Sequence, residues 1–329
     1  MLILILELII GLFLIVYGSN FLVEGSTSVA KKLGISQFVV GMTIVGIGTS
    51  TPEMVVSFIS AIEGKCDMAV GNIVGSNLAN TFLILGLVAM IKPLGYTKNN
   101  LYQDIPFCIL ASLLLFFFCL GNQFFLGEPN NIGRIEGALF LLSFAIFMYF
   151  SFKPFKFLRF KKDNFAESKI EEKIPSKIKT TKWAIITILG GLAGLIIGGN
   201  IFVSSASTLA TKAGVSDAFI GITIMALGTS LPELAASLTA ALKGRGQLAL
   251  GNIVGSNISN ILLILGGSAL IHPLTLNNIG IIDISLVLLS SILLLLVSFI
   301  GKKKYMDRWN GLFFLIIYIT YISWLIFSL

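Results

Sequence analysis

Two nearly identical hexapeptides lie 180 residues apart in this chain, and each stands inside an otherwise apolar segment. The first, at positions 48–53, reads GTSTPE, and the second, at positions 228–233, reads GTSLPE. A carboxylate at membrane depth costs roughly 2.5 kcal/mol or more, so two of them at matching places indicate a function. We expect the two halves of the protein to bring Glu53 and Glu233 together around a cation.

The composition is that of a polytopic membrane protein. Hydrophobic residues make up 56% of the 329 positions and charged residues only 12%, which is far more apolar sequence than a soluble core uses. The chain is apolar from Leu2 onward without a basic leader, so this segment is interpreted as a retained first helix and not as a signal peptide. The three cysteines suggest neither a disulfide framework nor a metal cluster.

Ten apolar segments are close to the ~20 residues that a spanning helix needs. The predicted fold is therefore all-α, with ten transmembrane helices. Their expected bounds are 2–31, 36–62, 67–91, 101–121, 132–152, 182–211, 216–242, 247–271, 278–300 and 309–328. The segment 153–181 is too polar to enter the bilayer and is predicted to be a solvated linker, with an anionic-lipid or regulatory role as the alternative.

The basic residues predict the orientation of the chain in the cell membrane. With the N-terminus outside, the inner loops hold 20 of the 23 Lys and Arg residues, and the outer loops hold only Lys65, Arg134 and Lys212. Because positive charge accumulates on the cytoplasmic side, both termini are expected outside and the linker inside. The net charge of +7 is then a topology signal, which argues against a nucleic-acid partner.

The two halves of the chain are an internal repeat. Residues 41–91 and 221–271 align without a gap and share 26 identities in 51 positions, including the heptapeptide GNIVGSN at 71–77 and 251–257. We assign residues 1–152 to the first five-helix repeat and 182–329 to the second. Because five is an odd number of spans, the second repeat must enter the membrane from the opposite side, as in the inverted repeats of secondary transporters.

The residues around the two hexapeptides are rich in oxygen. Pro52 and Pro232 lack an N–H and should interrupt their helices, freeing backbone carbonyls. Such carbonyls are tolerated at membrane depth where they line a cavity or find a partner. On the following helix of each half, asparagine and serine recur every four residues and should form one polar stripe. These positions are Asn72, Ser76 and Asn80 in the first half and Asn252, Ser256 and Asn260 in the second.

This oxygen-rich set suits a hard cation. Calcium takes 6–8 oxygen ligands from carboxylates, carbonyls and amides, and sodium uses similar oxygens. One site that two cations occupy in turn is a sufficient basis for antiport. Some of the polar residues could instead join helices by hydrogen bonds, each worth roughly 0.6 kcal/mol. For Asn77 and Asn257, which lie off the main stripe, both readings stay open.

Other intramembrane carboxylates fit this scheme less well. Glu7 and Glu24 have no acidic partner at the repeat-related position and lie near the ends of the first predicted helix. We interpret them as side chains that snorkel toward the membrane surface.

The paired Gly-Thr-Ser-x-Pro-Glu and Gly-Asn-x-x-Gly-Ser-Asn motifs resemble the two alpha-repeats of the calcium/cation antiporter superfamily, with the prokaryotic sodium/calcium exchangers as the nearest likeness. The alpha-repeats would cover about 36–91 and 216–271. The resemblance implies a non-enzymatic transporter without a cofactor, which carries calcium and sodium. It also implies that helices 2–31 and 182–211 slide as a gating pair. Internal symmetry within one chain would allow it to work as a monomer.

The resemblance also implies roles for individual residues. Glu53 and Glu233 would be the central calcium ligands, shared with sodium. Backbone carbonyls would come from Thr49 and Thr229, and an outer sodium site from Ser50 and Ser230. The central and inner parts of the site would be lined by Ser76, Asn80, Ser256 and Asn260.

The chain departs from some relatives, including potassium-dependent ones, which have aspartate at the position of Asn260. The missing carboxylate argues against potassium dependence and leaves the sodium stoichiometry open. A proton/calcium antiporter would use the same carboxylates and is the first alternative. A cation channel is a second, although two buried carboxylates suit tight alternating binding better than fast exit. A hydrolase based on Ser50 or Ser230 lacks a nearby base.

Overall fold

The computed structural model describes residues 2–121, 131–152, 180–213, 226–276, 279–300 and 304–328. It is predominantly helical, and the strands among these residues are two residues long. Most of the predicted linker 153–181 and the first part of the predicted span 216–242 lie outside the described residues. Internal contacts divide the chain into two compact units, each of which contains residues from both halves of the sequence.

Unit 1 comprises Met1–Pro52 and Pro175–Asn252. Its helices are α1 (Leu2–Leu33), α2 (Gln37–Val40), the π-helix η1 (Gly41–Val45), α3 (Gly46–Thr49), α9 (Thr181–Lys212), α11 (Ala226–Thr229), α12 (Leu231–Leu242) and the first part of α13 (Gly246–Ile258). Ser36 begins α2 by accepting a hydrogen bond from the Val39 amide, and Thr180 begins α9 in the same way with Trp183.

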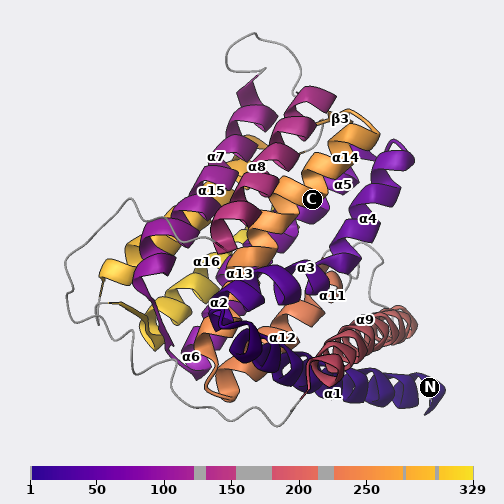
Figure 1. Ribbon diagram of the computed structural model, residues 1–329. Helices are drawn as coiled ribbons and strands as arrows, with labels where there is room; N and C mark the ends of the chain where they lie inside the picture. Colours follow the sequence, from indigo (N-terminus) through magenta and orange to yellow (C-terminus); the bar gives the residue numbers. More distant parts are fainter. Residues whose placement is uncertain are drawn as a thin grey trace. The chain divides into compact units, whose positions relative to one another are not determined.

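The two longest helices, α1 and α9, pack side by side in opposite directions (Figure 1). A Cβ atom on Gly11 would lie 2.9 Å from the Gly198 carbonyl, and one on Gly18 would lie 2.9 Å from the Gly191 carbonyl. Gly191 and Gly198 are the repeat equivalents of Gly11 and Gly18, so the two contacts join the same pair of repeat positions with the halves exchanged. This exchange of equivalent positions is the pattern that an inverted repeat predicts.

Unit 2 comprises Glu53–Ile174 and Ile253–Leu329. In chain order its helices are α4 (Thr51–Ile62), α5 (Cys66–Leu78), η2 (Ala79–Ile84), α6 (Leu85–Ile91), η3 (Asn100–Asp104), α7 (Ile105–Gly121), α8 (Arg134–Phe152), the end of α13, η7 (Ser259–Leu265), α14 (Gly266–Ile271), α15 (Ile281–Leu296), the short 3-10 helix η8 (Val297–Phe299) and α16 (Arg308–Ser328). Its strands are β1 (Leu94–Gly95), β2 (Asn131–Ile132), β3 (Leu274–Thr275) and β4 (Tyr305–Met306).

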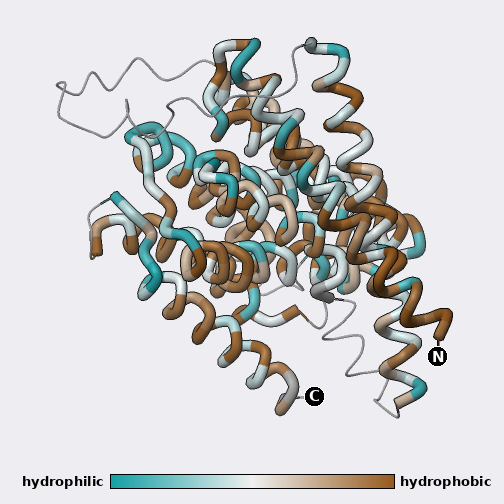
Figure 2. The backbone as a smooth tube through the Cα atoms, turned by 90° about the horizontal axis from the view of Figure 1, so that it is seen from below, coloured by the Kyte–Doolittle hydropathy of each residue, from teal (hydrophilic) through white to brown (hydrophobic). Residues whose placement is uncertain are grey.

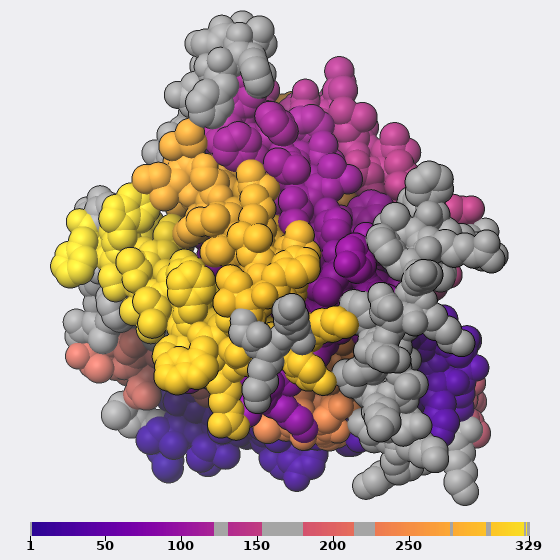
Figure 3. Space-filling view, turned by 90° about the vertical axis from the view of Figure 1, so that its left-hand side faces the viewer, coloured from indigo at the N-terminus to yellow at the C-terminus, as the bar shows by residue number. Residues whose placement is uncertain are grey.

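Equivalent segments of the two halves also have equivalent partners inside unit 2. Strand β1 pairs with β4, and β3, which is 180 residues after β1, pairs with β2. Helix α6 packs on α16, and its counterpart α14 packs on α8. Figure 3 shows another contact between the halves, with α15 in orange and α7 in purple adjoining at the surface. The Ser112 and Ser291 hydroxyls join these two helices over 2.8 Å.

Seven helices of the described residues are long and apolar enough to cross a membrane, and a bent pair raises the number to eight. These are Leu2–Leu33, Cys66–Ile91, Asn100–Gly121, Arg134–Phe152, Thr181–Lys212, Gly246–Ile271 and Ile281–Phe299, with Gln37–Thr49 and Thr51–Ile62 as the bent pair. Their bounds agree with the predicted spans to within a few residues. Figure 2 shows the hydrophobic character of α1 near the N-terminus. The membrane-embedded, helical class is confirmed, while the count of ten spans stays a prediction.

Candidate ion-binding site

Both hexapeptides coincide with a break in a helix. In the first half α3 ends at Thr49, α4 begins at Thr51, and the two segments meet at an angle of 47°. In the second half α11 ends at Thr229 and α12 begins at Leu231. The residue between the segments is a serine in each case, with φ −79° and ψ 10° at Ser50 and φ −88° and ψ 4° at Ser230. This sparsely populated backbone region is common among site residues.

Unit 1 brings residues of the two hexapeptides into direct contact. The Ser50 hydroxyl donates to Oε1 of Glu233 over 2.9 Å, although the residues are 183 positions apart. Both side chains are buried, with relative exposures of 1%. A charge-assisted hydrogen bond of this kind is about twice as strong as a neutral one. The side chain of Glu233 is therefore held in place by a residue from the other half of the chain.

Asn252 supports the same cluster from the side. Its amide nitrogen donates to the Ser237 hydroxyl over 2.8 Å and to the Glu233 carbonyl over 3.4 Å. Its side-chain oxygen accepts from the Thr49 hydroxyl over 3.2 Å. All of these groups are buried. Sequence reasoning placed Asn252 on the polar stripe but did not assign it the role of connecting α3, α12 and α13.

Unit 2 contains the equivalent cluster around Glu53. Asn72 donates to the Ser57 hydroxyl over 2.9 Å and to the Glu53 carbonyl over 3.2 Å, the two bonds that Asn252 makes at positions 180 residues later. The Ser76 hydroxyl donates to Oε1 of Glu53 over 3.5 Å, at the limit of hydrogen-bond distance. Glu53 is 1% exposed. Within its own unit, each glutamate thus accepts a hydrogen bond from a serine hydroxyl at its carboxylate and one from an asparagine amide at its backbone carbonyl.

Asn80 and Asn260 lie at repeat-equivalent positions near the start of the π-helices η2 and η7. Single π turns inside α-helices are frequent at functional sites, and periodicity alone did not predict these two. Both asparagines are at most 1% exposed, and neither their amide nitrogens nor their oxygens have a hydrogen-bond partner among the described residues. Buried amides without partners are unfavourable, so these two positions are candidates for binding a ligand.

The remaining predicted ligands are distributed between the units. Ser230, in unit 1, and Ser256, in unit 2, are buried. The Thr229 hydroxyl, also in unit 1, has no hydrogen-bond partner among the described residues. Pro52 was expected to free backbone carbonyls in the preceding turn, but one of these, the Gly48 carbonyl, accepts a hydrogen bond from the Thr51 hydroxyl over 2.8 Å. Part of the predicted carbonyl set is therefore already satisfied by the protein.

The structure identifies partners for Glu7 and Glu24, while their interpretation as snorkelling side chains stays a prediction. Glu24 accepts hydrogen bonds from Lys243 and Arg245, and Glu7 accepts one from Ser205 over 2.8 Å. Both carboxylates thus bind partners on other elements of unit 1, which the spacing of residues along α1 alone cannot show.

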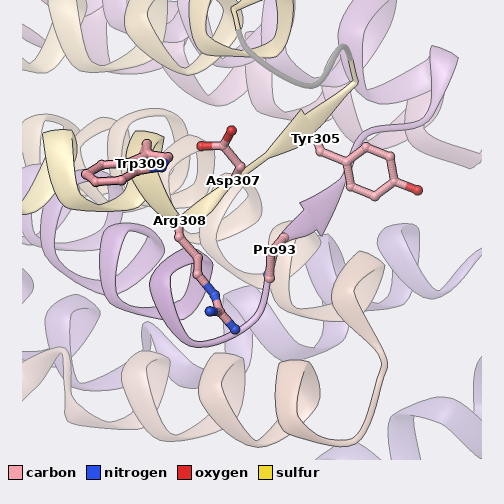
Figure 4. Close-up of a pocket in the computed structure, with 5 residues that line it drawn as sticks. All are labelled: Pro93, Tyr305, Asp307, Arg308 and Trp309. Carbon is pink, nitrogen blue, oxygen red and sulfur yellow. The ribbon is translucent and has the colours of Figure 1, made fainter.

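Unit 2 contains an open pocket (Figure 4). Its volume is about 580 Å³, and it is lined by Pro93, Tyr305, Asp307, Arg308 and Trp309 near the β1–β4 pair. Asp307 accepts from the Asn310 amide over 3.0 Å and so begins α16. None of the ten predicted ion ligands lines this pocket.

Comparison with known proteins gives a consistent family. The family model described as "Sodium/calcium exchanger protein" matches residues 3–153 and 183–327. CaxA of Alkalimonas amylolytica, described as an antiporter, is 38% identical over 97% of both chains. The sodium/calcium exchanger MaX1 of Methanosarcina acetivorans is 32% identical over 96% of this chain and 97% of its own. A solved structure of the sodium–calcium exchanger NCX_Mj is similar with a TM-score of 0.81 and 30% identity, covering 98% of this chain and 99% of the other.

Proposed function

Because the chain belongs to the sodium/calcium exchanger family, we propose that it exchanges sodium for calcium across the membrane by alternating access. The family consists of transporters and not of enzymes. The relatives are named as exchangers or antiporters, which supports cation antiport. The proposal goes further in naming sodium as the coupling ion and in assigning the ligands.

The bond between Ser50 and Glu233 is the observation that carries this proposal. It joins the two repeated hexapeptides, and Glu53 follows Ser50 by only three residues in sequence. We propose that Glu53 and Glu233 share one cation site, with oxygens from Thr49, Thr229, Ser50, Ser230, Ser76, Ser256, Asn80 and Asn260. Two carboxylates neutralise one calcium ion or the same charge carried by sodium ions, so the cations compete for one set of ligands.

Alternating binding also fits the placement of the polar groups. Glu53 and Glu233 are nine-tenths or more buried, and a channel that conducts rapidly requires weaker or more numerous sites. The unpartnered amides of Asn80 and Asn260 would be satisfied when a cation and its water enter. The predicted placement in the membrane, with both termini outside and the linker 153–181 in the cytoplasm, is part of the same proposal, as is function as a monomer.

Calcium uptake into sodium-loaded liposomes tests the proposal. Purified protein is reconstituted, and radioactive calcium uptake is followed after dilution into sodium-free buffer, with and without a proton ionophore. We expect uptake that requires internal sodium, survives the ionophore and is lost in Glu53→Gln and in Glu233→Gln. Glu7→Gln is the matched control, since Glu7 is an intramembrane carboxylate outside the proposed site.

Three results would contradict the proposal in different ways. Uptake driven only by a pH gradient would identify a proton/calcium antiporter. Calcium flux that ignores both gradients would favour a channel. Absence of flux in folded protein would mean that calcium is not the transported ion.

A further inference from the structure

A cluster of charges in unit 1 connects α1 to the turn between α12 and α13. Oε1 of Glu24 accepts from Nζ of Lys243 over 3.0 Å and lies 3.2 Å from Nη2 of Arg245. Nη1 of Arg245 donates to the Val23 carbonyl over 2.9 Å, so the guanidinium binds both a side chain and the backbone of α1. Gly244 makes the tight turn between the two basic residues with a φ of +78°, where other residues are strained.

The cluster is more buried than a surface ion pair. The side chain of Arg245 is 2% exposed, and those of Glu24 and Lys243 are 22% and 28% exposed. A buried guanidinium needs a countercharge because desolvation without one is strongly unfavourable. Arg245 and Glu24 therefore depend on each other, and the contact between α1 and this turn is favoured as long as both are charged.

An open pocket lies beside the contact between α1 and α12. Its volume is about 520 Å³, and it is lined mainly by apolar side chains of α1 and α12, with Ser19, Thr239 and Lys243 among the polar ones. Within this contact the Ser19 and Thr239 hydroxyls lie 2.8 Å apart. Polar groups therefore contribute to the contact between α1 and α12 beside this open pocket.

The other half of the repeat has no counterpart of this cluster. The positions equivalent to Glu24, Lys243 and Arg245 are Ser204, Glu63 and Lys65. Lys65 and Glu63 form an exposed ion pair with each other over 2.7 Å, within their own turn. The internal repeat thus has a charged connection to a long helix in its second half and only a local surface pair in its first.

We propose that Glu24, Lys243 and Arg245 form an ionic tie that holds α1 against α12 and stabilises one of the two alternating-access states. This inference rests on the proposed antiport function. If α1 and α9 move during transport, the contact between α1 and α12 forms in one state and breaks in the other. Because the tie has no counterpart in the first half, it stabilises only one of the two states. The predicted orientation puts the Lys243 turn on the cytoplasmic side, so the tie favours the state in which the inner path is closed.

Disulfide trapping between α1 and α12 tests this positioning role. Ser19→Cys with Thr239→Cys places two thiols at the observed contact, and the native cysteines are at most 6% exposed. The rate at which a mild oxidant crosslinks the pair reports the time that α1 spends on α12. We expect crosslinking to stop sodium-driven calcium uptake, and reduction to restore it.

The tie is then broken in this double-cysteine background. Glu24→Gln should lower the crosslinking rate roughly tenfold or more, since charge-assisted hydrogen bonds are among the strong ones. Lys243→Gln keeps the ion pair between Glu24 and Arg245. It should lower the crosslinking rate roughly two- to fivefold, as expected for the loss of a partly exposed pair. The exchange of charges in Glu24→Arg with Arg245→Glu should recover most of the rate. Glu7→Gln, whose partner Ser205 is on α9, should leave it unchanged.

The outcomes separate this inference from the proposed function. A crosslinking rate unchanged in folded Glu24→Gln protein would overturn the tie, and so would normal exchange by fully crosslinked protein. If Glu24→Gln does not fold, an unchanged rate in Lys243→Gln overturns it. Absence of sodium-driven uptake in the unmodified protein would instead refute the proposed antiport, whatever the crosslinking rates.

Discussion

The Ser50 hydroxyl donates to the Glu233 carboxylate over 2.9 Å, so a serine at the helix break of the first half orients a carboxylate at the break of the second. Both residues belong to the repeated hexapeptides, and neither side chain is accessible to solvent. If Glu233 is a cation ligand, as proposed, this hydrogen bond to its carboxylate reduces the ordering that binding requires.

Removing this hydroxyl should weaken cation binding without unfolding the protein. A hydrogen bond to a charged group contributes ~1.5–3 kcal/mol, so Ser50→Ala should raise the sodium and calcium concentrations for half-maximal exchange by roughly ten- to a hundredfold. Ser50→Thr keeps the hydroxyl and should retain most of the affinity. The measurement is the concentration dependence of calcium uptake, and equal half-saturation in Ser50→Ala and the unmodified protein would contradict the prediction.

The two equivalent asparagines that support the carboxylate helices should both contribute to stability. Asn72→Ala and Asn252→Ala each remove hydrogen bonds to a buried hydroxyl and a buried carbonyl, and Asn252→Ala also removes the bond from the Thr49 hydroxyl, so its effect should be the larger. Loss of such partners should lower the free energy of unfolding by ~1–3 kcal/mol in each case. Thermal unfolding in detergent measures this. Asn20→Ala is the control, because among the described residues Asn20 bonds only to the Val16 carbonyl of its own helix.

Close contact between α1 and α9 should be sensitive to a single methyl group. A Cβ on Gly191 would lie 2.5 Å from the Leu22 amide nitrogen, whereas the neighbouring Gly190 has open space around the same position. Gly191→Ala should therefore destabilise the protein by ~1–3 kcal/mol, the usual range for overpacking. Gly190→Ala should be neutral or slightly stabilising, since alanine favours a helix by ~1 kcal/mol over glycine. Comparable melting temperatures for the two variants would refute this packing argument.

Much of the fold follows from the apolar pattern. Span bounds were predictable because membrane helices need ~20 apolar residues, and the helix breaks were predictable because Pro52 and Pro232 cannot continue a helix. The repeat itself was visible in the shared GNIVGSN segments. The π-helices at Asn80 and Asn260 were not predictable, because a one-residue insertion in the hydrogen-bond pattern leaves no periodic trace in a uniformly apolar segment.

Contacts between side chains far apart in the chain could not be predicted from the sequence either. The spacing of Glu24 along α1 indicates a helix end but gives no information on Arg245, which is 221 positions away and adjoins it only in the folded unit. Likewise the repeat predicts that Asn72 and Asn252 are equivalent, and only the structure identifies Ser57 and Ser237 as their partners. Which residues support a site, and not only which residues form it, depends on such contacts.

The unpartnered amides of Asn80 and Asn260 should affect stability and transport in opposite directions. Replacement of Asn260 by leucine removes a buried polar group without a hydrogen-bond partner among the described residues, so ion-free protein should become more stable by ~1–3 kcal/mol. If the amide is a cation ligand, the same variant should lose much of the stabilisation that calcium provides and exchange more slowly. Thermal unfolding with and without calcium, together with liposome uptake, measures both effects.

Asn77→Leu is the comparison for this last prediction. The Asn77 amide nitrogen already donates to the Ile73 carbonyl over 2.7 Å, so its removal should not stabilise the ion-free protein to the same extent. Nor should it reduce the calcium-dependent rise in melting temperature, if Asn77 serves to join helices. A loss of stability in ion-free Asn260→Leu, with unchanged calcium stabilisation, would mean that Asn260 has a structural partner and no role as a ligand.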